Sequence, residues 1–244
     1  MTSGWKKTVQ FLARTPNDAA VAVLVPLLDS PHAPLPVAAL EALLERRDAT
    51  GLPELLRRLN RIRPGWEDVL SEKCGRLNGT FREAILGQDV RLAGYACEAI
   101  CAFREFDLMP VLLTALEADE NPLADLAGQT VIRLAAALSE ELDQTPDRRR
   151  RDPQFVRRSL VASLEKSVEH FGRHGRKESL EAFLMLASRE NATLKQILLD
   201  PGNPCLHDVL RMLRGSKRRG VFRLLLSFLD DPHAPLAALQ VIAG

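Results

Sequence analysis

The sequence predicts an all-helical protein, a right-handed α-solenoid of about five to six helical hairpins that form one domain over residues 1–244. Three observations support this prediction. Helix-forming Leu and Ala are abundant, whereas the 244 residues include only nine Phe, two Trp and one Tyr. Apolar residues recur at helical spacing along most of the chain. One turn motif occurs twice, near the two ends of the sequence.

The repeated motif is the most specific of these observations. Residues 28–36 read Leu-Asp-Ser-Pro-His-Ala-Pro-Leu-Pro and residues 229–237 read Leu-Asp-Asp-Pro-His-Ala-Pro-Leu-Ala, so seven of nine positions are identical. The copies lie 201 residues apart, a distance that holds about five units of a repeat of about 40 residues. A Leu-rich helix precedes each copy, so each motif is expected to be the turn of a helical hairpin.

The first half of the chain is expected to contain short helices joined by tight turns. A helix opens the chain, because Trp5, Val9 and Leu12 share one helical face. The next helix is expected to begin at Thr15 and Pro16, since Thr15 can accept hydrogen bonds from backbone N–H groups and Pro16 suits the first helical position. Pro26 should kink that helix. Further helices are expected over residues 35–46, 52–59, 66–77, 81–86 and 90–103.

The second half continues the pattern around a polar interruption. A hairpin is expected over residues 107–142, with its turn at 119–122. Residues 143–153 form an Arg-rich loop that Pro146 and Pro153 punctuate. Helices are then expected over residues 153–171, 177–187, 194–199, 205–213 and 236–243.

The last helix is shorter than its counterpart after the first turn motif, which makes the last repeat incomplete and the chain a candidate part of a longer array. An uncapped repeat exposes its stacking surface. We therefore expect Leu236, Leu239 and Ile242 to belong to an open-end interface, a candidate surface for self-association.

Two segments resemble HEAT repeats, namely the turn Asp89-Val90-Arg91 and the helix over residues 110–116. The resemblance covers residues 18–48, 81–142 and 217–244. It implies that turn residues stack between neighbouring hairpins, with Asp89 and Arg91 at both positions of the family pattern and Pro34 to Pro36 replacing the Arg of the first repeat. The repetition of the turn adds further structural candidates. These residues are Asp29, His32, Asp230 and His233.

Charge is balanced over the whole chain but clustered locally. The 33 basic and 32 acidic residues give a formal net charge of +1, which excludes a general basic field for nucleic acid. Two basic clusters are candidates for contact with phosphates or an acidic partner, and a solvated surface is the alternative. They comprise Arg148, Arg149, Arg150, Arg151, Arg157 and Arg158, and then Lys217, Arg218 and Arg219.

The sequence predicts no catalytic, metal or cofactor site. Cys97 and Cys101 are four residues apart, as are His170 and His174, but neither pair has a second pair at ligand spacing. No nucleophile elbow, dinucleotide fingerprint or zinc-protease motif occurs. With four cysteines, no signal peptide and no apolar span, we expect reduced thiols in a cytoplasmic protein without membrane contact.

The resemblance implies a non-catalytic scaffold for protein–protein interaction. Helical-repeat proteins bind partners on an extended concave surface lined by one helix of each hairpin. Two alternatives remain open. One is a nucleic-acid-binding protein, similar to the HEAT-like DNA glycosylases, that would use the Arg-rich loop. The other is an enzyme resembling the HEAT-like bilin lyases, which only the fold supports.

Overall fold

The computed structural model describes residues 4–144 and 151–243, and these residues form helices and connecting turns with no β-strand among them. This confirms the all-helical class that the Leu- and Ala-rich periodicity predicts. In the described part of the chain, no helix is long and apolar enough to cross a membrane.

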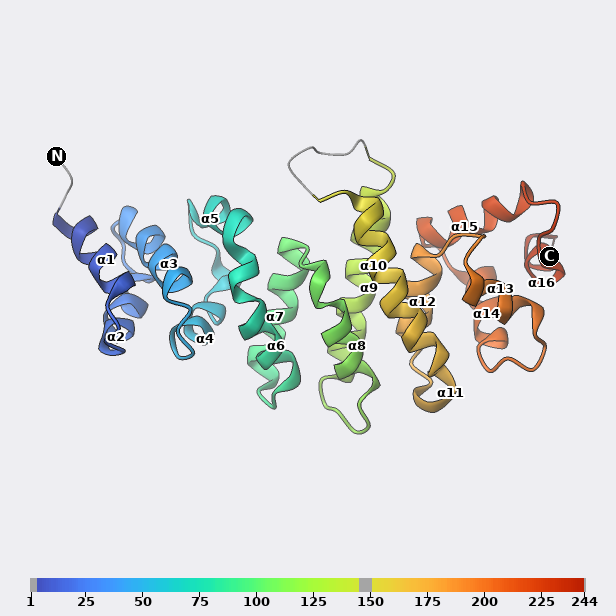
Figure 1. Cartoon of the computed structure of the whole chain (residues 1–244), viewed down its shortest axis with the longest axis horizontal. Coiled ribbons are helices and arrows are strands. Elements are labelled where there is room, and N and C mark those ends of the chain that lie inside the picture. Colours follow the sequence, from blue (N-terminus) through green and yellow to red (C-terminus); the bar gives the residue numbers. More distant parts are fainter. Residues whose placement is uncertain (1–3, 145–150, 244) are drawn as a thin grey trace. The chain divides into compact units, whose positions relative to one another are not determined.

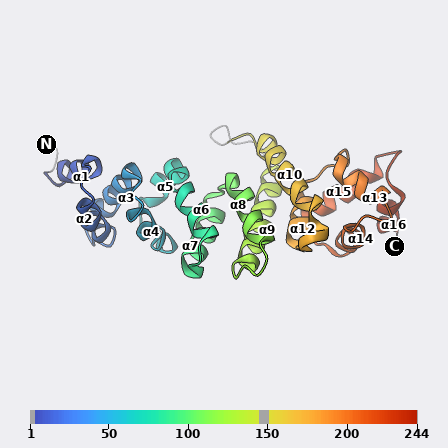
Figure 2. The same cartoon turned by 60° about the horizontal axis from the view of Figure 1, so that its bottom comes forward.

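The chain divides into two compact units, Met1–Leu108 and Met109–Gly244. The helices of the first unit are short and follow one another in chain order (Figures 1 and 2). They are α1 (Gly4–Arg14), α2 (Ala19–Leu27), α3 (Pro34–Arg46), α4 (Gly51–Leu56), η1 (Leu59–Arg61), α5 (Trp66–Lys73), η2 (Cys74–Leu77), α6 (Asn78–Leu86), α7 (Val90–Phe103) and η3 (Phe106–Leu108).

Helix α3 is the central element of the first unit's N-terminal part. It packs against α1 and α2, which precede it, and against α4 and α5, which follow it. Its inward face is fully buried at Leu40, Leu43 and Leu44, because these positions repeat at the spacing that keeps one helical face turned to its neighbours. The helix ends where Arg47 adopts the left-handed conformation, with φ of 55°.

Arginines that follow α4 connect successive turns of the first unit. The Arg58 Nε lies 2.9 Å from the Asp29 carboxylate, and Arg57 Nη2 lies 3.6 Å from the carboxylate of Asp89. Arg63 Nη1 also donates to the Ser30 carbonyl oxygen at 2.9 Å. Each aspartate sits at the turn of a different hairpin, so these contacts join the hairpin turns on either side of α4.

Asp48 caps the turn that leads into α4. Its Oδ1 accepts hydrogen bonds from the Thr50 hydroxyl at 2.6 Å, the Thr50 N–H at 2.8 Å and the Gly51 N–H at 3.1 Å. The Thr50 hydroxyl is the main reason that the pKa of Asp48 is lowered from its ordinary value, with the backbone N–H groups adding to it. The ionised carboxylate is therefore the form that stabilises this turn.

We expect Asp48→Ala to lower the free energy of unfolding by about 1 kcal/mol at neutral pH, because it removes the acceptor of this turn. A lowered carboxylate pKa contributes stability above the unfolded-state value of about 3.9, and that contribution is lost as the pH falls through the folded value. The difference between wild type and variant in urea unfolding should therefore shrink in acid. Asp18→Ala is the control, because Asp18 precedes α2 without a side-chain capping bond. An equal loss in both variants would contradict this role.

The helices of the second unit are arranged around α12. Helices α8, α9, α10 and α12 lie side by side in both views of the unit (Figures 1 and 2). The unit comprises α8 (Met109–Glu117), α9 (Ala124–Glu141), α10 (Pro153–Glu169), α11 (Phe171–His174), α12 (Lys177–Leu186), α13 (Ala192–Leu199), α14 (Leu206–Gly215), α15 (Arg219–Leu229) and α16 (Leu236–Ala243).

Helix α12 is the core helix of the second unit, and it packs against α9, α10, α14 and α15. Most of its residues are buried, including Ser179, Leu180 and the whole run from 182 to 186. A helix that is apolar on nearly every side requires neighbours all round it. The buried Ser179 hydroxyl donates a hydrogen bond to the Arg176 carbonyl oxygen at 2.9 Å, so this polar group has a partner inside the core.

The expected start of the second helix is wrong by about three residues. Helix α2 begins at Ala19 and not at Pro16, because Asn17 Oδ1 accepts from the Ala19 N–H at 2.9 Å and so forms a local turn that competes with the helix. Thr15 Oγ1 is 3.4 Å from the Asn17 nitrogen and caps nothing further along. Pro26 lies inside α2, which ends one residue later at Leu27.

The flanks of the predicted Arg-rich loop agree with the sequence. Helix α9 ends at Glu141 and α10 begins at Pro153, where Asp152 Oδ1 accepts from the Gln154 N–H at 2.9 Å. Residues 145–150 of this segment, including Arg148, Arg149 and Arg150, lie outside the described residues.

Candidate binding groove

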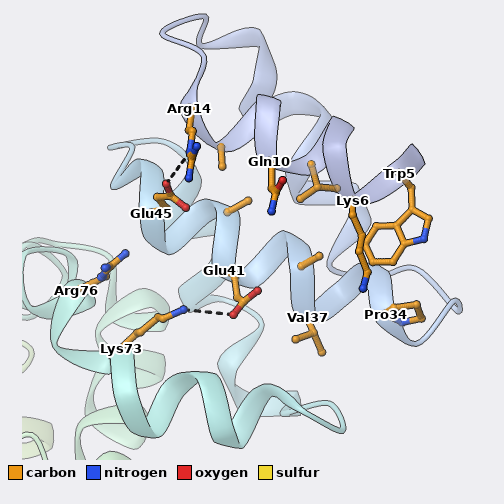
Figure 3. Close-up of a pocket in the computed structure, with 14 residues that line it drawn as sticks. Trp5, Lys6, Gln10, Arg14, Pro34, Val37, Glu41, Glu45, Lys73 and Arg76 are labelled. Carbon is orange, nitrogen blue, oxygen red and sulfur yellow. Dashed lines mark hydrogen bonds and ion pairs between the residues drawn. The ribbon is translucent and has the colours of Figure 1, made fainter. Parts of the chain in front are cut away.

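The first unit carries an open groove of about 670 Å³ between α1 and α3, bordered by the end of α5 and by η2 (Figure 3). Residues of α1 that line it fall at positions 5, 6, 9, 10, 13 and 14, which is one stripe of a helix. Those of α3 fall at 34, 37, 38, 41, 42 and 45, again one stripe. The groove therefore follows from two helical faces packed side by side, with Lys73 and Arg76 at its border.

The floor of the groove is apolar and built from small side chains. Val9, Ala13 and Ala42 are buried, and Val37 and Ala38 are half-buried. Ala38 and Ala42 are four residues apart on α3, so they lie one above the other on the side that lines the groove. Small side chains at this spacing leave room for another segment to approach the backbone of α3 closely.

The rim of the groove is charged, with more basic than acidic residues. Arg14 Nε lies 3.4 Å from Glu45 Oε1, and Lys73 Nζ lies 3.3 Å from Glu41 Oε1 (Figure 3). The Arg14–Glu45 pair is largely exposed and the Lys73–Glu41 pair is half-exposed, and pairs in contact with solvent contribute only up to about 1 kcal/mol. A bound ligand can therefore exchange them for its own contacts.

Two further cations at the groove lie outside these ion pairs. Lys6 Nζ lies 5.6 Å from the centre of the Trp5 ring, and both side chains extend at one end of the groove (Figure 3). At the other end, Arg76 Nη1 donates to the Leu44 carbonyl oxygen at 3.4 Å. Among the described residues neither Lys6 nor Arg76 forms an ion pair, so four basic residues face two acidic residues and the rim favours an acidic ligand.

Some residues of the predicted basic clusters form contacts within the second unit. Arg157 Nε donates to the Leu186 carbonyl oxygen at 2.7 Å, and burial together with the nearby charge of Arg223 lowers its pKa. Arg223 in turn pairs with the Asp143 carboxylate. Arg218 Nε lies 3.0 Å from Glu181 Oε1. These three guanidinium groups therefore hold α10, α12 and α15 to their neighbours.

The remaining residues of these clusters that the structure describes lie on the surface. The guanidinium carbon of Arg158 lies 5.9 Å from the centre of the Phe155 ring, which is itself exposed. Arg151, Lys217 and Arg219 are exposed. Arg157 approaches α12 at Leu186, and Arg218 approaches it at Glu181.

The turn residues that the HEAT resemblance and the repeated motif single out are all placed by the structure. Asp29 and Asp89 pair with Arg58 and Arg57, two arginines that no sequence motif indicates. Arg91 is exposed, and its backbone N–H donates to Asp89 Oδ1 at 3.0 Å. Sequence spacing gives no sign of the Arg58 contact, because it joins residues 29 positions apart.

The two histidines of the repeated turn have equivalent backbone roles. The His32 N–H donates to Ser30 Oγ at 3.2 Å, and the His233 N–H donates to Asp231 Oδ1 at 2.9 Å. Both side chains are exposed. Near the second copy of the turn, the Arg189 guanidinium interacts electrostatically with Asp230 and Asp231, and its Nη1 donates to the Ser227 carbonyl oxygen at 3.0 Å.

The cysteines and the histidine pair do not form a metal site in the described part of the chain, where no group of three or more potential ligands gathers. Burial raises the pKa of the Cys74 thiol, as does the neighbouring Glu105, and burial with Asp208 raises the pKa of Cys205 to about 11. A thiol with a raised pKa is a poor nucleophile and a poor metal ligand. His170 and His174 contact two different carbonyl oxygens, those of Lys166 and Ser167.

Comparison of the chain with protein-family models and with curated proteins finds no match. The functional interpretation therefore depends on the groove and on the chemistry of its surface.

Proposed function

We propose that this chain is a HEAT-like helical-repeat protein that acts as a non-catalytic scaffold, and that the groove between α1 and α3 binds a segment of a partner protein. The observation that carries the proposal is the groove itself, which combines an apolar floor of small residues with a rim of four basic and two acidic residues. Stacked hairpins whose turns are joined by Asp–Arg contacts support the repeat interpretation for the first unit.

The shape of the groove favours a polypeptide over a small molecule. Small-molecule sites enclose most of the ligand surface, whereas this groove is open along two parallel helical faces. An amphipathic helix can place its apolar side chains on such a floor and its charged side chains at the rim. The groove fits a short helix with small or medium apolar residues, and the excess of basic residues at the rim selects acidic flanks.

A selection from a displayed library of random peptides of 16 residues tests this proposal. We expect enriched peptides to share apolar residues at helical spacing and a net negative charge. Synthetic versions should then bind the chain in fluorescence anisotropy, with an affinity that falls as the salt concentration rises. A selection that enriches nothing, or that enriches basic or uniformly apolar peptides, would contradict the proposed occupant.

Lys6→Glu should weaken the binding of such a peptide roughly tenfold, because it replaces an attraction at the rim by a repulsion. Lys7→Glu is the matched control: it makes the same charge change at the next residue of α1, and Lys7 does not line the groove. The measurement is the dissociation constant of each variant by fluorescence anisotropy, with circular dichroism to verify the fold. Equal weakening in the two variants would indicate a general charge effect and would exclude the groove as the binding site.

A further inference from the structure

Helix α15 has two apolar faces, and only one of them is covered. Val221, Leu224 and Phe228 are buried against the rest of the second unit. On the other side, Phe222 is 60% exposed, Leu226 47% and Leu229 56%. These three residues follow one another at intervals of four and three, so they form a continuous stripe. Exposed apolar surface of this kind marks an interaction site.

Helix α2, which precedes the first copy of the repeated motif, lacks large apolar side chains on the corresponding face. Its buried positions follow the same spacing as those of α15, because Val21, Leu24 and Leu28 are buried like Val221, Leu224 and Phe228. With the buried faces matched in this way, the exposed positions that correspond to the stripe hold Ala22, Pro26 and Asp29. The exposed apolar stripe is therefore a feature of α15 and not of both copies of the repeat.

Charges along α15 determine how a second helix can lie on this stripe. Its start is basic, with Lys217 and Arg219 exposed and Arg218 paired with Glu181. Its end is acidic, with Asp230 and Asp231. Arg189 lies near this end but forms its own ion pair with Glu190 at 2.7 Å, so the end keeps a negative excess.

We propose that two copies of this chain associate through the exposed stripe of α15, with the two α15 helices antiparallel about a two-fold axis. In this arrangement Phe222 packs near the partner's Leu229, and Leu226 lies near the axis beside the partner's Leu226. The basic start of each helix faces the acidic end of the other, whereas a parallel arrangement would bring like charges together. Leu236, at the start of α16 in the same hairpin, is a further exposed apolar residue, with 76% of its surface accessible.

Sedimentation velocity of the full chain over a range of concentrations tests this association. We expect a reversible dimer in the wild type and a monomer for Leu226→Glu, because that change places two carboxylates near the axis. Phe11→Glu is the control, since Phe11 is an exposed apolar residue of α1 in the first unit, and it should remain dimeric. Circular dichroism verifies that each variant is folded. A wild type that stays monomeric, or a folded Leu226→Glu variant that stays dimeric, would overturn the proposal.

A charge-exchange experiment tests the antiparallel geometry separately. Arg219→Glu and Asp230→Lys should each raise the dimer dissociation constant roughly tenfold, because each creates two repulsive contacts across the axis. An equimolar mixture of the two variants should associate with near wild-type affinity, since both contacts in the mixed dimer become attractive again. A mixture that associates no better than either variant alone would overturn the antiparallel arrangement.

Discussion

Replacing Gly220 with alanine should destabilise the protein by about 3 kcal/mol, the upper part of the range for overpacked interiors. Gly220 lies in the first turn of α15, where that helix crosses the ends of α12 and α9. A Cβ at this position would lie 2.4 Å from the Met185 carbonyl oxygen and 2.7 Å from Ser139 Oγ. The carbonyl belongs to the backbone of the core helix α12, so it cannot rotate away, and α15 must move instead.

Urea unfolding followed by circular dichroism measures this effect. Gly172→Ala is the matched control in the same unit, because its Cβ would meet Pro204 at an ordinary distance of 3.7 Å. That helical glycine should tolerate alanine or gain a few tenths to about 1 kcal/mol from its better helix propensity. Comparable unfolding midpoints for Gly220→Ala and wild type would show that α15 adjusts without cost, and would contradict the close crossing.

The contrast between these glycines shows which part of the fold the sequence can predict. Periodic Leu and Ala positions predict most helices to within a few residues, because each helix buries one face whatever its neighbour is. Gly220 and Gly172 look alike in the sequence, since what separates them is the approach of Met185 and Ser139 from distant segments. Crossing contacts of this kind depend on tertiary packing, which no local pattern encodes.

The candidate site also has a part that the sequence predicts and a part that depends on tertiary packing. The repeat pattern predicts that a partner would bind a surface lined by one helix of each hairpin, and the lining residues of the proposed groove in α1 and α3 each fall on one helical stripe. Which stripe faces solvent depends on how α1 packs on α3, and the sequence does not contain that register. The basic clusters were predicted from their local charge density, but Arg157 of the first cluster donates to the carbonyl oxygen of Leu186, 29 residues away, and so acts within the fold.

Arg46→Met should lower the free energy of unfolding by about 2 to 3 kcal/mol, because it removes several charge-assisted hydrogen bonds at one point. The Arg46 guanidinium donates from Nη1 to the carbonyl oxygens of Leu12 and Thr15 at 2.8 and 2.5 Å, and from Nη2 to that of Asn17 at 3.2 Å. These carbonyls belong to the last turn of α1 and to the connection into α2. One side chain at the end of α3 therefore holds the two preceding helices.

Arg14→Met is the matched control, because it makes the same change at an exposed arginine whose ion pair with Glu45 contributes less than about 1 kcal/mol. Arg46→Lys should fall between the two, since an ammonium group keeps the charge but cannot reach three carbonyls as a planar guanidinium does. Urea unfolding of the three variants gives this order directly. Losses of equal size for Arg46→Met and Arg14→Met would show that Arg46 contributes only surface charge.

The same substitution connects the fold of the first unit to the proposed groove. Arg46 does not line the groove, but it fixes α1 against α3, and these two helices form its walls. We therefore expect Arg46→Met to weaken peptide binding under conditions where the protein is still folded, with little change in the salt dependence of binding. Lys6→Glu should do the opposite, changing the salt dependence and leaving stability nearly unaltered. Two variants that separate in this way would distinguish a residue that shapes the groove from one that contacts the ligand.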